Sequence, residues 1–394
     1  MRLKTLAIQV AITLGATLVL ANLYAVWRLQ QLQNTAYRSH DRFTTGKRYQ
    51  SDLNTHFTNQ FGDLCAIAGF SRGGRCPFWA GPRRHDLRTD HLGYKTLTPL
   101  VSADRVIAGD SFLAASGGDG MADQLGQQLQ GLTGLRFYEA AHPGDPGDYL
   151  GRVAELEGIK PRGKAYLLLV FEGNDLARSI PGELLKPAQR PPTPNPLLDS
   201  LHRKVSWLVE SVQQPPLQRL LVLVAEAAKA RNEGDRPVGH GVQVVRLLGQ
   251  SHGMLINNRD TSLDPSLRLP AVLRAGSLGW LAPHLLCIVI VPTKYSVHFS
   301  YRSLGERHPM LQRDLQDLQA IGIQNLDLTT ALRQAATARP ERPLYWRDDT
   351  HWNREGIRVA AGAMKADPRC LGLNFNDHEA PRVRPRAIGT TVLP

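Results

Sequence analysis

The stretch RVIAGDS, residues 105–111, predicts how this chain folds. The apolar run 106–108 is typical of a short strand, Gly109 permits a tight turn, and residues 121–129 favour a helix. A strand, a turn and a helix in this order indicate an α/β fold. Because open α/β sheets bind ligands at the carboxyl ends of their strands, Ser111 is a candidate site residue.

Other parts of the chain continue this alternation. Continuously apolar runs at 165–171 and 285–291 predict two strands that are covered on both faces. The first runs straight into Glu-Gly-Asn-Asp at 172–175, so polar groups again follow a strand. Further elements are a short strand at 324–328 and helices at 309–320, 329–336 and 356–365. We therefore expect a mostly parallel sheet within an α/β domain.

The N-terminus predicts a membrane anchor. Residues 5–27 carry no charge, and as a helix they would span about 35 Å, enough for the hydrocarbon core. Arg2 and Lys4 precede this run, so the positive-inside bias keeps the N-terminus cytoplasmic and places the rest of the chain outside. A cleaved signal peptide is the alternative, although the run lacks a clear small-x-small cleavage site.

The expected organisation has four parts. Residues 1–4 form a cytoplasmic tip and 5–27 the transmembrane anchor, while 28–102 form an extracytoplasmic stalk and an irregular lead-in. Residues 103–394 form the catalytic domain, which includes a helical insertion at about 180–275. Within the insertion, residues 198–230 have Leu and Val at helical spacing. The length of 394 residues and the 42% hydrophobic content allow a large core.

The cysteines and the net charge bound the class of protein. Cys65 and Cys76 are close enough to close a disulfide loop in an oxidising compartment, or they remain two unpaired thiols. Cys287 lies in an apolar run and is most simply a buried core thiol. The net charge of +12 suits an acidic polymer or an anionic membrane face, or is an ordinary basic surface. No nucleic-acid module and no metal-ligand cluster are evident, so we expect neither nucleic acid nor metal as partner.

Residues far apart in the sequence supply the groups for nucleophilic catalysis. A serine hydroxyl needs an imidazole to take its proton, and the imidazole needs a carboxylate to fix its tautomer. Ser111 is the candidate nucleophile and His351 the candidate base, while Asp348 or Asp349 is the candidate acid. For Ser111 the alternative is a helix cap, and for His351 it is a surface loop with chance acids nearby.

An oxyanion intermediate also needs hydrogen-bond donors. Asn174 is the side-chain candidate, because it follows the strand at 165–171. Gly144 could add a backbone N–H from a loop, and Ser111 could add its own N–H. An ordinary turn glycine is the alternative for Gly144.

The blocks Gly-Asp-Ser, Gly-Asn-Asp and Asp-Asp-Thr-His in this order resemble the SGNH (GDSL-type) hydrolase superfamily, over roughly residues 103–373. With the anchor, FEGND, VPTKYSV and DDTHWN, the chain is similar to membrane-anchored SGNH-like proteins related to the AlgX/AlgJ alginate O-acetylation family. The resemblance implies a three-layer sandwich with a doubly wound sheet. It also implies Ser111 as nucleophile, His351 as base, and Gly144 and Asn174 in the oxyanion hole. The general superfamily implies Asp348 as the acid, and the alginate type implies Asp349, which we prefer.

The function that this resemblance implies is O-acetylation of a cell-surface or exported polysaccharide through an acetyl-serine, without a cofactor. The catalytic domain would be periplasmic, held at the inner membrane by residues 5–27. Acetyl-CoA is cytoplasmic, so a multi-pass membrane O-acyltransferase is the expected acetyl supplier. Two alternatives remain, a carbohydrate or lipid esterase of the same fold and a polysaccharide-binding scaffold without catalysis.

Overall fold

The computed structural model describes a large part of the 394 residues. The described residues are 9, 13–22, 24, 44–45, 48–59, 62–67, 83–114, 120–141, 147–178, 242–246, 253–257, 266–298 and 308–373. Residues 13–22 are helical, and about half of the expected anchor lies outside these ranges. Within them, no helix combines the length and the apolar character that a membrane crossing requires.

Five strands form the central sheet, and every neighbouring pair in it is parallel. In spatial order they are β13 (Gln324–Asp327), β12 (Leu285–Val291), β7 (Tyr166–Phe171), β5 (Arg105–Gly109) and β6 (Phe137–Ala141). The chain moves outward from β5 to β6 and then returns to β7 on the other side of β5. This reversal makes the gap between β5 and β7 the topological switch point, where open α/β sheets bind ligands. The predicted parallel sheet is confirmed.

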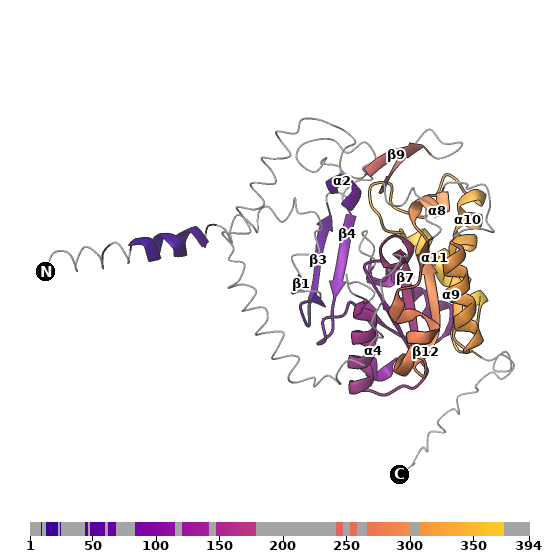
Figure 1. The fold of residues 1–394 in the computed structure, drawn as a ribbon. Helices are drawn as coiled ribbons and strands as arrows, with labels where there is room; N and C mark the ends of the chain where they lie inside the picture. The colour runs from indigo at the N-terminus through magenta and orange to yellow at the C-terminus, as the bar shows by residue number, and fades with distance from the viewer. Residues whose placement is uncertain are drawn as a thin grey trace, which may run out of the picture.

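Helices cover both faces of the sheet (Figure 1). Alternate residues of each strand point to opposite faces: Ile107 and Leu167 belong to one buried cluster, and Val106 and Leu168 to the other. The first cluster includes α3 (Leu125–Thr133), α10 (Thr329–Ala338) and α11 (Arg354–Ala366). The second includes α4 (Gly147–Ile159) and α9 (Pro309–Ala320). The architecture is therefore three-layered, with a parallel sheet between two helical layers, and its β7 and β12 are apolar throughout.

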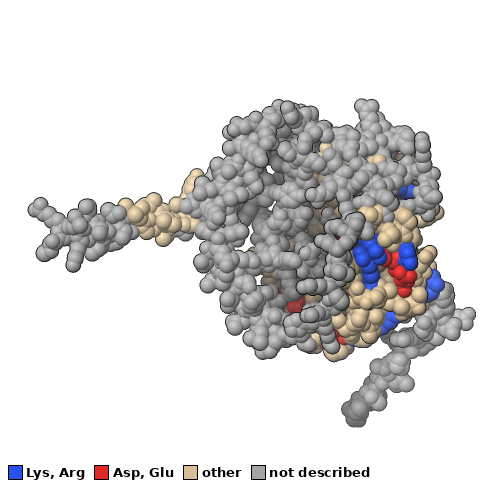
Figure 2. Space-filling model, viewed as in Figure 1, with Lys and Arg blue, Asp and Glu red and all other residues tan. Residues whose placement is uncertain are grey.

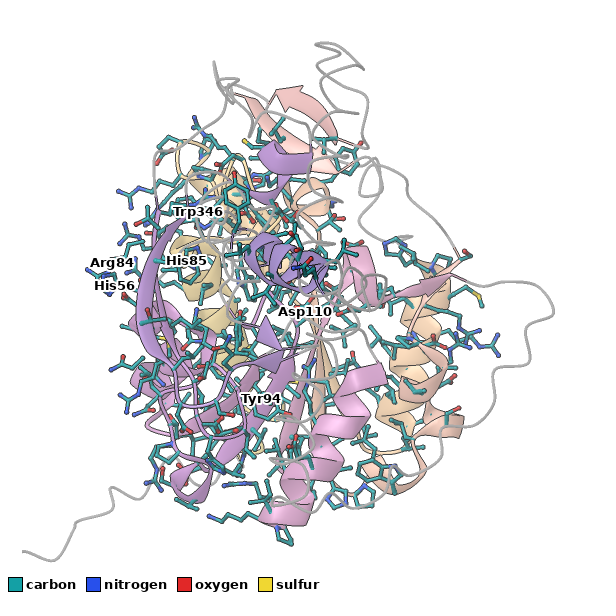
Figure 3. All side chains as sticks on the ribbon, turned by 90° about the vertical axis from the view of Figure 1, so that its left-hand side faces the viewer. His56, Arg84, His85, Tyr94, Asp110 and Trp346 are labelled. Carbon is teal, nitrogen blue, oxygen red and sulfur yellow. A yellow bond between two sulfur atoms is a disulfide. The ribbon has the colours of Figure 1, made fainter. Side chains whose placement is uncertain are left out.

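The lead-in is more ordered than the sequence predicted. The strands β3 (Asn54–Asn59) and β4 (Arg83–Arg88) pair as an antiparallel hairpin, with α2 (Asp63–Ile67) between them. Its inner side chains, including Phe57 and Leu87, join the core. His56 and Arg84 project from its outer side (Figure 3). The alternating burial along β4 explains the hairpin, and the organised fold begins well before residue 103.

The expected helical insertion at about 180–275 needs correction. The later part of the expected helical insertion contains the antiparallel hairpin of β9 (Val242–Arg246) and β10 (Gly253–Asn257), whereas residues 198–230 lie outside the described ranges. The strand β11 (Leu267–Arg268) pairs with β8 (Ala177–Arg178), and the residues after it pack into the core.

The cysteines also differ from expectation. Cys287 is not a free core thiol, because it forms a disulfide with Cys370 just after α11. This bond ties β12 to the end of the fold across a sequence separation of 83. Cys65 is also disulfide-bonded, and Cys76 lies outside the described residues. Two oxidised cysteines in the core are typical of a protein from an oxidising compartment.

Candidate functional site

Ser111 lies in a tight turn directly after β5. Gly109 ends the strand, and a Cβ there would come within 3.0 Å of the Leu113 and Leu169 side chains, so the position needs glycine. The Asp110 carboxylate accepts a hydrogen bond from the Phe112 N–H at 2.8 Å, which holds the turn closed. The Ser111 hydroxyl is therefore fixed at the carboxyl end of β5, beside the switch point.

Two buried cationic side chains bind backbone carbonyls on either side of this turn. Arg152 on α4 donates to the carbonyl of Gly109 at 2.5 Å and to that of Ala140 at 3.3 Å. Lys95 donates to the carbonyl of Ala114 at 2.6 Å. Both side chains are almost fully buried, so these charge-assisted bonds act with little screening. The sequence did not single out either residue.

His351 joins Ser111 to a carboxylate. Its Nε2 lies 2.8 Å from the Ser111 Oγ, and its Nδ1 lies 2.6 Å from the Asp349 Oδ1. With Nδ1–H donated to the carboxylate, Nε2 can accept the serine proton. All three side chains are buried. Residues separated by 240 positions thus meet in one hydrogen-bonded chain.

Aromatic packing fixes the imidazole. Phe112 stacks on Phe171 with 4.0 Å between ring centroids, and its other neighbours include His351 at 4.9 Å and Trp352 at 5.6 Å. The Trp352 indole N–H donates to the Phe112 carbonyl at 2.9 Å. These rings exclude water and leave His351 little rotational freedom. Next in the sequence after Trp352, Asn353 caps the start of α11, where its side chain accepts hydrogen bonds from the backbone N–H groups of residues 355 and 356.

The structure assigns different partners to the two candidate acids. Asp349 contacts His351 through its Oδ1, which also accepts the His351 backbone N–H at 3.0 Å. Asp348 instead contacts Arg83 at 2.5 Å and the Gly62 N–H at 3.0 Å. Asp348 is therefore not placed as the orienting acid. The loop is a tight turn, closed by backbone bonds between Trp346 and both His351 and Asp349.

The pKa of Asp349 is held well below its usual range. Burial by itself would raise this pKa, but the charge and hydrogen bonds of His351 and the charge of Arg83 lower it by more. The Asp349 carboxylate is therefore ionised wherever the protein is folded at neutral pH. An ionised carboxylate on Nδ1 is what the base needs to become an imidazolium.

Residues 62–65 and Arg83, which precede the sheet in the sequence, complete this site. We name residues 348–351 the acid loop. Gly62, Asp63 and Cys65 donate backbone N–H groups to it, and Asp63 accepts the N–H of Thr350 at 2.6 Å. Arg83 on β4 spans Asp348 and Asp349 and lies over the Trp346 ring at 4.7 Å. No local pattern predicts contacts between residues about 286 positions apart, so the sequence did not indicate them.

Gly62 offers a direct test of this contact. A Cβ on Gly62 would lie 2.0 Å from the Asp348 carbonyl oxygen and 2.8 Å from the Asp349 Cβ. We expect Gly62→Ala to shift the acid loop and to lower kcat about 10²-fold, the cost typical of a 1 Å misplacement. Gly131→Ala is the control, because a Cβ there meets open space within α3. Equal activity of the two variants on an aryl acetate would contradict the role of this segment.

The candidate oxyanion donors are only partly described. Gly144 lies outside the described residues. Asn174 belongs to α5 (Glu172–Asp175), which follows β7 at the same sheet edge as Ser111. The Asn174 side chain is not among the side chains that the structure describes. This short helix is held by Glu172, which accepts the Thr293 N–H at 2.7 Å and contacts His308 Nε2 at 2.7 Å. The backbone around Asn174 is thus fixed beside the nucleophile.

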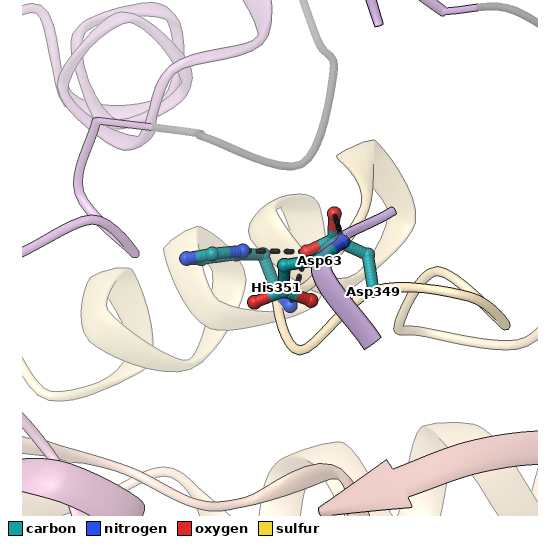
Figure 4. A group of neighbouring side chains, drawn as sticks. All are labelled: Asp63, Asp349 and His351. Carbon is teal, nitrogen blue, oxygen red and sulfur yellow. Dashed lines mark hydrogen bonds and ion pairs between the residues drawn. The ribbon is translucent and has the colours of Figure 1, made fainter. Parts of the chain in front are cut away.

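Asp63, Asp349 and His351 are residue types that can bind a metal ion, and they lie close together. Ligand atoms of Asp63, Asp349 and His351 lie within 4.8 Å of one another (Figure 4). Hydrogen bonds already account for this closeness, since Asp349 binds His351 and accepts the Asp63 N–H at 3.1 Å. The Arg83 guanidinium lies on the same carboxylate and opposes a second cation. The arrangement fits proton transfer better than metal binding.

The charge on the described surface is mixed. On the face shown in Figure 2, Lys and Arg side chains lie beside Asp and Glu side chains and form no continuous basic area among the residues drawn in colour. Among surface side chains, Arg84 pairs with Asp86 and Arg358 with Glu355.

Comparison with known proteins agrees with the geometry. Residues 284–387 match the model of a family described as the SGNH hydrolase-like domain of acetyltransferase AlgX. The matched part includes β12, α11 and the acid loop, whereas Ser111 lies before it. A search among curated proteins finds no match. The family match confirms the resemblance inferred from the motifs, and over this C-terminal part the chain is similar to SGNH hydrolase-like domains of the AlgX acetyltransferase type.

Proposed function

We propose that this protein is a serine acyltransferase that O-acetylates a cell-surface or exported polysaccharide through an acetyl-serine intermediate. The observation that carries the proposal is the hydrogen-bonded chain from Ser111 Oγ to His351 Nε2, at 2.8 Å, and from His351 Nδ1 to Asp349, at 2.6 Å. Its place at the switch point of a parallel sheet supports a ligand site there. The similarity to an acetyltransferase family supports acetyl as the transferred group.

In the first half-reaction, Ser111 Oγ attacks the carbonyl carbon of an acetyl ester while its proton passes to His351 Nε2. The carbonyl oxygen becomes an oxyanion, for which we propose Asn174, Gly144 and the Ser111 N–H as donors. When the intermediate collapses, the bond to the leaving alkoxide breaks and the alkoxide takes the proton from His351. The acetyl group remains as an ester on Ser111.

In the second half-reaction, a sugar hydroxyl attacks this ester and gives its proton to His351. The bond between Ser111 Oγ and the acetyl carbon then breaks, and the proton returns to Ser111. Water in place of the sugar would release acetate, which is the esterase outcome. The choice therefore depends on whether the site favours a sugar hydroxyl over water.

We place the catalytic domain outside the cytoplasm, anchored by residues 5–27. The uncharged run and the preceding Arg2 and Lys4 support this topology. The disulfide between Cys287 and Cys370 supports an oxidising compartment such as the periplasm. An acetyl donor must then cross the membrane, so we propose a multi-pass membrane O-acyltransferase as the supplier.

Product analysis tests the proposal. Purified full-length protein is given an aryl acetate with and without a soluble polysaccharide, and both free acetate and glycan-bound acetyl are measured. We expect the polysaccharide to divert acetyl from water to the glycan. Free acetate alone would replace the transferase by an esterase, and no turnover above buffer on any donor would favour a scaffold.

A further inference from the structure

Asp63 is a second carboxylate beside the proposed base, and the reaction described above does not use it. It begins α2 and is only 7% exposed. Its carboxylate accepts the backbone N–H of Thr350 at 2.6 Å, and its own N–H binds Asp349 Oδ2 at 3.1 Å. Thr350 is the residue between the proposed acid and the proposed base. Asp63 therefore holds the peptide that sets the distance between them, and its side chain lies beside those of Asp349 and His351 (Figure 4).

The charges around Asp63 are unbalanced. The titratable groups that face it are Asp348, Asp349 and His351 on the acid loop and Arg83 on β4. On β10, which packs beside α2, the side chains described are the apolar Met254, Leu255 and Ile256. Three carboxylates thus surround one guanidinium and one imidazole. With a neutral imidazole the group has an excess of negative charge, and an added proton reduces it.

We propose that Asp63 is a positioning residue that fixes the acid loop and raises the proton affinity of His351. This inference rests on the proposed acyl transfer, in which His351 must accept a proton from Ser111. An ionised carboxylate within about 4–6 Å favours the charged form of a base. Asp63 would therefore stabilise the imidazolium in addition to Asp349, which contacts the ring directly.

Asp63 itself titrates near neutrality. Burial and, after it, the charge of Asp349 raise its pKa to about 6, against the lowering effects of His351 and Thr350. Asp63 and His351 then share protons as a coupled pair. Removing the Asp63 charge lowers the total proton affinity of the pair, whichever group holds the proton. The acid limb of the rate profile should move to lower pH.

Asp63→Asn is the decisive variant, because its amide oxygen can still accept the Thr350 N–H while the charge is lost. Histidine-selective ¹³C labelling of the full-length protein reports the apparent pKa of His351 by NMR, with the resonance assigned by its loss in His351→Gln. We expect the pKa of His351 to fall by about one unit or more. In kcat/KM, the acid limb should shift in the same direction, and kcat should fall about tenfold with KM unchanged.

Asp86→Asn is the matched control. It removes a carboxylate from β4 that pairs with the exposed Arg84, and it should leave His351 unchanged. An unchanged pKa of His351 in folded Asp63→Asn would overturn the inference. Should that variant not fold by circular dichroism, Asp63→Ser removes the same charge with less bulk and gives the same test. Because NMR needs no turnover, a shifted pKa without Ser111-dependent activity would reject the proposed function alone.

Discussion

We expect Ser111→Ala to lower kcat/KM for an aryl acetate by at least about 10⁴-fold. Removing the nucleophile from such a group of three hydrogen-bonded residues lowers the rate about as much as removing all three. Here the Ser111 Oγ is the atom that faces His351 Nε2 at 2.8 Å, so the variant has no group to form the acetyl ester. Alanine fits the same buried turn, and the fold should persist. The measurement is the initial rate of phenolate release.

Ser102→Ala is the control for this prediction. Its hydroxyl bonds only to the Pro99 carbonyl at 3.0 Å among the contacts described, away from the acid loop. This variant should keep the full rate. A Ser111→Ala protein that is folded and releases phenolate as fast as Ser102→Ala would show that the reaction does not pass through Ser111.

We expect the two neighbouring aspartates to fail in different ways when changed to asparagine. Asp349→Asn leaves the shape of the site intact but places an amide beside His351 Nδ1, which favours the wrong tautomer. A drop in kcat of about 10⁴-fold is the effect known for such a change. Asp348→Asn leaves the contacts of His351 in place and removes a buried charge from Arg83. Breaking one partner of a buried pair costs about 3–5 kcal/mol of stability.

Each variant serves as the control for the other. Chemical denaturation measures the free energy of unfolding, and kcat on an aryl acetate measures catalysis. Asp349→Asn should be the weaker catalyst, and Asp348→Asn should be the less stable protein. A larger kcat loss in Asp348→Asn at a temperature where both are folded would reverse their assignment.

The sequence predicted the sheet because its strands are short apolar runs with polar residues at their ends. The run at 285–291 is a strand with the expected bounds, and the helix at 309–320 begins and ends as expected. Local apolar periodicity determines such elements, and long-range contacts have only to pack them. The same reasoning placed Ser111 after β5, because a Gly-Asp-Ser turn between strand and helix is a local feature.

The parts that could not be predicted depend on distant pairs. Cys287 looks like a core residue in its own strand, and its partner Cys370 lies 83 positions away in the sequence. Asp63 and Arg83 lie in a stretch without a clear pattern, and their role follows from contact with the acid loop. Local spacing left both Asp348 and Asp349 open, and the preference for Asp349 came from the resemblance alone; the contact itself depends on which carboxylate the folded loop turns toward the imidazole.

The central claim is that Ser111 carries the acetyl group during the reaction, and trapping the intermediate tests it most directly. The full-length protein is mixed with an aryl acetate, quenched in acid within a turnover, digested and analysed by mass spectrometry. We predict one acetyl group on the peptide that contains Ser111 and its absence in Ser111→Ala. Rapid turnover with no acetyl on that peptide at any quench time, or with acetyl on another residue, would contradict the account.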